Sequence, residues 1–234
     1  HLDAVLPGLD DDKARRAATV QALTDARTEG MAAIEAEFRT HPRNARSTIT
    51  AYADLTDAMV AACFHVAIRH LHKQGTPTEA ERLSVLAVGG YGRAEMAPQS
   101  DVDLLFLTPW KITAWAESVI ESMLYMLWDL RLKVGHASRT VKDCLRLGRE
   151  DVTIRTALLE HRFLSGDADL AEELDRKLRA EVFHKTGAEF IEQKLEERAA
   201  RHKRQGGQRY VLEPNVKEGK GGLRDLQTLY WIGK

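Results

Sequence analysis

Hydrophobic positions recur at helical spacing in the first part of the chain. A stretch from about residue 10 to residue 38, rich in Ala, Glu and Arg, predicts one long helix. A second stripe, from residue 49 to about residue 71, follows the i, i+3, i+4, i+7 spacing of an amphipathic helix. Residues 41–44 contain a proline and break the pattern between them. Because neither helix can bury its stripe alone and the connection is short, we expect an antiparallel pair.

After residues 75–77 (Gly-Thr-Pro) the pattern changes from helical spacing to short apolar runs. Residues 83–88 and 102–107 are bounded by turn-forming or polar residues and indicate buried strands. The residues that follow predict a helix over 112–130, a third strand over 132–138, and a capping box at 140–143 that opens another helix. This part of the chain therefore predicts mixed α and β layers.

From residue 151 onward the pattern is helical again, and no strand signal interrupts it. A turn is expected at 165–167, a charged stretch covers 169–204, and a glycine-rich loop over 211–222 leads into the apolar segment 223–232. We therefore expect an α+β fold with a short mixed sheet. An N-terminal helical pair would cover 1–77, the core around the sheet 78–145, and a helical domain 146–234.

Composition narrows the class of protein. The 234 residues include 34 Lys and Arg against 35 Asp and Glu, and this net charge of −1 argues against a nucleic-acid partner. Hydrophobic residues make up 44% and charged residues 29%, as in ordinary globular chains. The apolar runs are far shorter than the roughly 20 residues of a bilayer span, so no membrane association is expected. The two cysteines, Cys63 and Cys144, form no metal-binding or disulfide pattern, and we expect reduced thiols in a cytoplasmic protein.

The most informative chemistry lies at the second predicted strand. Side chains two apart in a strand point to the same face, so Asp101 and Asp103 would project together while Val102 and Leu104 face the opposite layer. Two carboxylates this close are costly unless a cation lies between them, and hard oxygen ligands suit Mg²⁺. Magnesium held in this way usually completes its shell with water and substrate phosphates, which indicates phosphoryl or nucleotidyl transfer.

A glycine pair between the two strands fits the same chemistry. Gly89 and Gly90 follow the first strand, and without a Cβ their backbone N–H groups can approach phosphate oxygens. Arg93 is placed to add a charge-assisted contact to the same phosphates.

Together, the glycine pair and the downstream Asp-Val-Asp resemble the signature of the polymerase-β-type nucleotidyltransferase superfamily. The longer string over 88–105 is more specific and resembles the protein-PII uridylyltransferases of bacterial nitrogen control. Segments 127–136, 164–167 and 213–227 agree with that family, and the resemblance covers roughly residues 80–232. Ala94 and Lys220 stand where Gly and Pro are more usual, and neither change removes a ligand.

The resemblance implies a reaction and a set of site residues. Enzymes of that family move UMP from UTP onto a tyrosine of the PII signalling protein, releasing pyrophosphate. The implied partners are UTP and PII, and the implied cofactor is Mg²⁺. The implied catalytic and metal-binding residues are Asp101 and Asp103, and the implied nucleotide-binding residues are Gly89, Gly90, Arg93 and Ser100.

The superfamily commonly has a third acidic residue on a later strand. The predicted third strand contains no carboxylate, so the candidates are Asp129, Glu213 and Asp225. The family also carries a downstream HD-type domain that removes UMP, and ligand-sensing ACT domains. No His-Asp dipeptide occurs among the nine histidines, so we expect a fragment that ends before the HD domain and lacks the removing activity.

Two other classes of function remain open. A related nucleotidyltransferase using ATP or another acceptor would keep the metal site, whereas a non-catalytic helical module would bind PII without Mg²⁺. Spacings of five and two do not place His65, His70 and His72 on one helical face, so we interpret them as structural or exposed. His136 either faces the active site or is a core histidine. The basic run over 198–209 is interpreted as a solvated helix face or as an attractor of UTP or an acidic partner.

Overall fold

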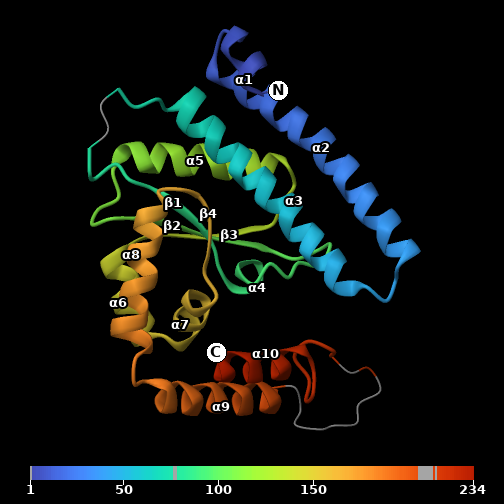
Figure 1. Ribbon diagram of the computed structural model, residues 1–234, viewed down its shortest axis with the longest axis vertical. Helices are drawn as coiled ribbons and strands as arrows, with labels where there is room; N and C mark the ends of the chain where they lie inside the picture. The colour runs from blue at the N-terminus through green and yellow to red at the C-terminus, as the bar shows by residue number, and fades with distance from the viewer. Residues whose placement is uncertain (1, 76–77, 205–212, 214) are drawn as a thin grey trace. The chain divides into compact units, whose positions relative to one another are not determined.

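The computed structural model describes residues 2–75, 78–204, 213 and 215–234 (Figure 1). The chain divides into two compact units. The first contains His1–Cys144 and Glu160–Leu174, and the second contains Leu145–Leu159 and Asp175–Lys234. The predicted helical pair and the predicted sheet region therefore share one unit, and the chain crosses between the units more than once.

The first unit begins with the predicted helical pair. After the short α1 (Leu2–Val5) and a 3₁₀ turn (Leu6–Gly8), α2 spans Asp12–Thr40 and α3 spans Ala45–Val66, and Figure 1 shows them antiparallel. The side chain of Asp11 caps α2 by accepting a hydrogen bond from the N–H of Ala14 at 2.6 Å. The pair packs closely, because a Cβ on Gly30 would lie 2.8 Å from Leu55 Cδ1.

A π-helical turn, Ala67–Leu71, continues α3. It brings His65 and His70 to the same carboxylate, that of Asp3, so the expectation that these histidines do not share a face is wrong. The whole segment Ala45–Leu71 is long and apolar enough to cross a membrane by composition. Its apolar stripe lies in the core, where Ala53, Val60 and Cys63 are fully buried, and the core helix of a globular domain passes the same test.

Among the described residues, four strands form one sheet in the order β3-β2-β1-β4. The strands are β1 (Ser84–Ala87), β2 (Val102–Thr108), β3 (Val134–Thr140) and β4 (Arg162–Gly166). β1 pairs antiparallel with β2 and β4, while β2 and β3 are parallel. The three predicted strands are confirmed, the third lying slightly later than expected, and the mixed α+β character is confirmed with them.

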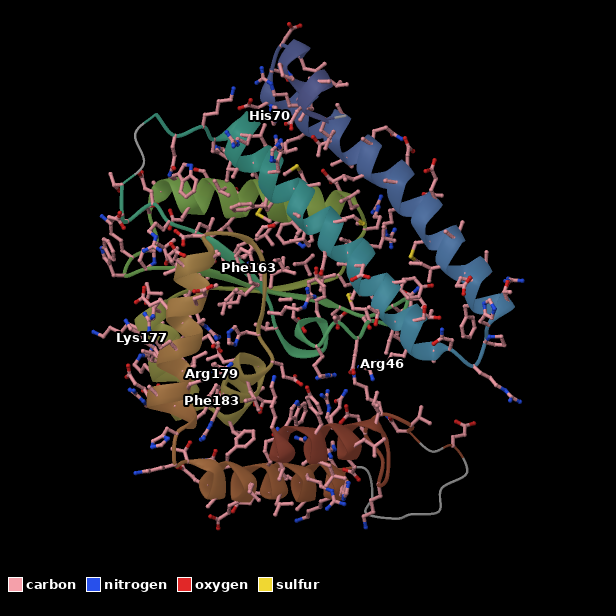
Figure 2. All side chains as sticks on the ribbon, in the orientation of Figure 1. Arg46, His70, Phe163, Lys177, Arg179 and Phe183 are labelled. Carbon is pink, nitrogen blue, oxygen red and sulfur yellow. The ribbon has the colours of Figure 1, made fainter. Side chains whose placement is uncertain are left out.

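The expectation that no strand follows residue 151 is wrong, because β4 lies there. β4 is a short edge strand, with Arg162 at its start and an exposed Phe163 (Figure 2). Its residues do not form an apolar run, and its pairing with β1 joins residues far apart in the sequence. Strand formation there depends on the exposed edge of β1 rather than on local pattern.

The two faces of the sheet have different roles. On one face, Val102, Leu104 and Phe106 of β2 join a core with α3 and with Met123 of α5 (Ala114–Asp129). Each such buried side chain stabilises the fold by about 1.5–3 kcal/mol. The alternate positions of β2, beginning with Asp103, face the opposite side. On that side Leu105 and Leu107 are also buried, so Asp103 is the polar position at the start of an otherwise apolar face of β2.

The helix α6 (Val141–Glu150) begins at the predicted capping box. Asp143 N–H donates to Thr140 Oγ1 at 3.1 Å, and Thr140 N–H donates to Asp143 Oδ2 at 3.3 Å. This reciprocal pair confirms the box. α8 (Ala168–Leu178) follows β4 and buries Leu170 and Leu174.

The second unit is helical, as expected. It contains α7 (Val152–Leu159), a π-helical turn (Arg179–Phe183), α9 (Gly187–Arg204) and α10 (Leu223–Gly233). The buried ammonium of Lys194 lies 4.3 Å from the ring centroid of Trp231, which joins α9 to α10. Residues 211, 212 and 214 of the predicted glycine-rich loop lie outside the described residues.

Candidate active site

Asp103 lies in a narrow slot between two glycines. Its backbone carbonyl accepts a hydrogen bond from the N–H of Val88 at 3.0 Å, which ties β2 to the end of β1. In the parallel register Asp103 stands opposite Gly135 of β3. A Cβ on Gly135 would lie only 2.4 Å from Asp103 Oδ1, and one on Gly89 would lie 3.4 Å from Oδ2. The carboxylate can occupy this position because Gly135 carries no side chain, whereas a Cβ on Gly89 would be in ordinary contact with it. The sequence analysis gave no role to Gly135, which lies within the segment 127–136.

Asp101 lies immediately before the first residue of β2 and is exposed. Burial alternates along this segment: Val102 and Leu104 are buried, Asp103 is half-buried and Asp101 is open to solvent. This alternation agrees with two carboxylates on the face opposite the α3–α5 core.

The glycine turn after β1 is the short helix α4 (Gly89–Gly92). Gly89 has φ +60°, a left-handed conformation that favours glycine. At Gly92 a Cβ would lie 1.9 Å from the carbonyl oxygen of Glu160, so the approach of β4 excludes any side chain. Gly90 differs from both, since the nearest atom to its Cβ position is Arg93 Nη2 at 3.7 Å. Backbone conformation therefore explains Gly89 and packing explains Gly92, but neither requires glycine at position 90.

Arg93 holds this turn by two ion pairs. Its Nη1 lies 2.6 Å from Oε1 of Glu160, which is buried, and its Nε lies 2.9 Å from Oε2 of Glu95. The guanidinium is thus oriented beside Gly90 before any ligand binds, and such charge-assisted bonds are among the stronger contacts in proteins.

A second arginine, absent from the sequence prediction, also anchors the turn. Arg162 Nη2 donates to the carbonyl of Tyr91 at 3.2 Å, and its Nε donates to the carbonyl of Gly92 at 3.3 Å. Asp57 of α3 orients Arg162, with Oδ2 2.6 Å from Nη1. These contacts join residues 70 to 105 positions apart, so no local motif could have revealed them.

Ser100 closes the turn that leads into Asp101. Its Oγ accepts a hydrogen bond from the N–H of Ala97 at 2.9 Å, and its own N–H donates to the carbonyl of Ala97 at 3.0 Å. Ser100 therefore stabilises the turn that precedes Asp101 and Asp103.

Of the candidates for a third acidic residue, Asp225 already has several partners. It accepts hydrogen bonds from Arg201 at 2.6 Å, from Arg198 at 3.2 Å and from the N–H of Gly221 at 2.8 Å, and it lies 3.0 Å from His202 Nε2. Burial opposes ionisation, but these bonds outweigh it and hold the pKa of Asp225 well below its usual range. Its carboxylate serves the helical unit.

This network corrects the interpretation of the basic run over 198–209 as a solvated face at Arg201, which is buried, whereas Arg198, Lys203 and Arg204 are exposed. Residues 205–209 of that run lie outside the described residues. Of the other third-carboxylate candidates, Asp129 is exposed at the end of α5, and Glu213 is also exposed.

His136 does not share the face of Asp103. It stands opposite Leu104 in the β2–β3 register, and its ring lies 6.4 Å from that of Trp128 on α5. It is also exposed. Both earlier interpretations, an active-site histidine and a core histidine, are therefore wrong.

Sequence comparisons show which known proteins this chain resembles. Residues 189–234 match the family described as GlnD PII-uridylyltransferase, and residues 3–128 match the family described as glutamate-ammonia ligase adenylyltransferase. A bifunctional uridylyltransferase/uridylyl-removing enzyme of Cereibacter sphaeroides is 72% identical over 96% of this chain and 24% of its own length. Enzymes of the same name from Ruegeria pomeroyi and Phenylobacterium zucineum are 65% and 52% identical, over 96% and 99% of this chain and 25% and 24% of their own lengths.

These matches place the chain among nucleotidyltransferase enzymes. Within that class, the chain belongs to the family of bifunctional uridylyltransferase/uridylyl-removing enzymes. Its residues 3–128 also match the adenylyltransferase family, so this segment carries sequence features of both kinds of enzyme. The chain spans about a quarter of the length of the curated relatives it matches.

Proposed function

We propose that the first unit is a polymerase-β-type nucleotidyltransferase centre that transfers UMP from UTP to a tyrosine of the PII protein and releases pyrophosphate. The observation that carries this proposal is the Asp103 carboxylate, seated between Gly89 and Gly135 beside an anchored glycine turn. Membership of the uridylyltransferase family supports UTP as the nucleotide and PII as the acceptor.

Asp101 and Asp103 are the residues that would hold Mg²⁺. The donor set fits this ion, because both groups offer hard carboxylate oxygens and Asp101 is open to solvent, which leaves room for water and phosphate ligands. Bound there, Mg²⁺ would supply charge neutralisation for the triphosphate. The absence of a side chain at Gly135 leaves the Asp103 carboxylate the room it occupies.

The glycine turn would receive the triphosphate. Gly90 has room for a Cβ, so a closely approaching phosphate gives a reason for glycine there that packing does not. Arg93 lies beside Gly90, held by Glu160, and would contribute positive charge. Arg162 fixes the turn through the carbonyls of Tyr91 and Gly92. A pre-ordered turn reduces the entropy lost when the nucleotide binds.

In the proposed reaction the tyrosine hydroxyl of the acceptor attacks the α-phosphorus of UTP in line. The new bond is tyrosine oxygen to phosphorus, the α–β phosphoanhydride breaks, and pyrophosphate leaves with the bond electrons. The hydroxyl proton passes to a base, for which Asp129 and Glu213 remain the candidates, because Asp225 is held by Arg201, His202 and Gly221 within the helical unit. UTP and PII make the cytoplasm the compartment that we propose for the protein.

A second candidate is adenylyl transfer. The match of residues 3–128 to glutamate-ammonia ligase adenylyltransferase favours it, because the strand aspartates and the glycine turn lie in that segment. The same metal site would then serve ATP and a different acceptor. The non-catalytic alternative, a helical module that binds PII, has no specific observation in its favour.

The test is transfer of α-labelled nucleotide to purified PII. We expect label from UTP on a PII tyrosine with Mg²⁺, and loss of at least a hundredfold in Asp101→Asn and in Asp103→Asn. Asp25→Asn is the matched control, because Asp25 is an exposed aspartate of α2. Labelling from ATP in preference to UTP would favour the second candidate. Undiminished transfer by Asp103→Asn would contradict the proposed centre.

A further inference from the structure

The end of α3 brings two histidines to an aspartate near the N-terminus. Asp3 Oδ1 lies 2.7 Å from His65 Nε2 and 2.8 Å from His70 Nε2, and the two ring centroids are 5.9 Å apart. The three ligand atoms lie within 4.8 Å of one another. Figure 2 shows His70 at the end of α3 beside α1. No residue of the proposed transfer centre takes part in this cluster.

The π-helical turn creates this arrangement. In a regular α-helix, side chains five apart diverge by about 140°, because each residue turns the helix by about 100°. Here the N–H of His72 donates to the carbonyl of Ala67 at 2.8 Å, the wider spacing of a π-turn, and this brings His65 and His70 onto one side. Single π-turns inside helices occur frequently at functional sites.

The hydrogen bonds alone add too little stability to account for the clustering of these three side chains. The Asp3 side chain is 67% exposed, and exposed pairs of this kind contribute little to stability. By contrast, only 10% of the His70 side chain is exposed, so its imidazole is withdrawn from water with Nε2 directed at the carboxylate.

We propose that Asp3 Oδ1, His65 Nε2 and His70 Nε2 form a binding site for a first-row transition-metal dication, with Zn²⁺ as the best fit. Two imidazoles and one carboxylate are a donor set that suits zinc and disfavours Mg²⁺ and Ca²⁺. Bonds of about 2.0–2.1 Å in a tetrahedral shell separate ligand atoms by about 3.3 Å. The two N–O distances would therefore widen by about half an ångström, which Asp3 can provide because it lies in the short, exposed α1.

Three protein ligands leave a fourth position open. The cluster borders a surface cavity of about 500 Å³, which is also lined by Arg69 and Lys73. These two cations oppose a bare dication nearby, but both are exposed to solvent, which screens their charge. They favour hydroxide or another anion over neutral water at the fourth position. A bound ion would tie the N-terminal helix to the end of α3.

The test is a calorimetric titration of Zn²⁺ into the 234-residue chain with excess Mg²⁺ present, so that the hard-oxygen site is already supplied. We expect one equivalent bound with a dissociation constant in the micromolar range or tighter. His70→Ala and Asp3→Asn should each weaken binding at least tenfold. His41→Ala is the matched control, because His41 also faces a carboxylate, Glu37 Oε1 at 2.8 Å, but as a single exposed histidine.

Co²⁺ gives an independent readout, since a tetrahedral site with nitrogen ligands produces a strong visible absorption. Unchanged Zn²⁺ affinity in both His70→Ala and Asp3→Asn, or no stoichiometric binding by the unmodified chain, would overturn the proposal. Asp3→Asn keeps the test decisive if His70→Ala disturbs the π-turn, because Asp3 lies outside α3. Asp103→Asn should bind Zn²⁺ normally, which separates this site from the proposed transfer centre.

Discussion

Substituting Gly135 by alanine tests the seat of the proposed metal ligand. The new Cβ would lie 2.4 Å from Asp103 Oδ1, whereas ordinary contacts begin at 3.4 Å. The carboxylate or strand β3 must therefore move by about 1 Å. A misplacement of that size in a reacting centre can reduce the rate by about a hundredfold. Since Asp103 is only half-buried, the overpacking should cost about 1 kcal/mol of folding stability, at the low end for such changes.

The assay measures Mg²⁺-dependent UMP transfer to PII together with urea unfolding. We expect Gly135→Ala to lose about a hundredfold in transfer while its unfolding midpoint changes little. Gly8→Ala is the matched control, because nothing lies within 4 Å of the Cβ position of Gly8. Full transfer activity in a folded Gly135→Ala would refute the reasoning that the empty space at position 135 places the Asp103 carboxylate.

Four further outcomes follow from the described contacts and burial. Gly90→Ala should unfold like the unmodified chain in urea but bind UTP at least tenfold more weakly, because its Cβ has room in the protein and not beside a phosphate. Arg162→Ala should lose about 1–3 kcal/mol in unfolding free energy and bind UTP more weakly, since two carbonyls of the glycine turn lose their donor. The lowered pKa of Asp225 means that its contribution to stability is complete above its ordinary value of 3.8 and is lost as pH falls toward the folded pKa. Unfolding curves of Asp225→Asn and the unmodified chain should therefore converge in acid. Burial raises the pKa of Cys63 to about 12, so a thiol reagent should modify it only after unfolding. The rate at which a chromogenic thiol reagent releases its coloured product, with and without denaturant, measures this.

The sequence pattern predicted those elements whose signal is local. The strands β1 and β2 are continuous apolar runs, and the capping box at Thr140 contains both of its partners within four residues. The alternation around Asp103 likewise follows from strand geometry alone. These features need no knowledge of the rest of the chain, and the structure agrees with each of them.

Other features depend on contacts that no local pattern contains. β4 forms because β1 offers an edge, and Arg162 finds the glycine turn across a long separation in sequence. His65 and His70 were assigned to different faces because regular α-helical spacing was assumed, and one π-turn overturned that assumption. Asp225 looked like a candidate for chemistry until its arginine and histidine partners were seen.

Calorimetric titration of UTP, ATP, CTP and GTP into the chain, with Mg²⁺ and again with a chelator, tests the central claim most directly. We predict that UTP binds preferentially, that the chelator abolishes binding, and that Asp103→Asn loses it even with Mg²⁺. Triphosphate binding that is equally strong with chelator, or that survives Asp103→Asn unchanged, would contradict a metal-dependent uridylyl-transfer centre at Asp101 and Asp103.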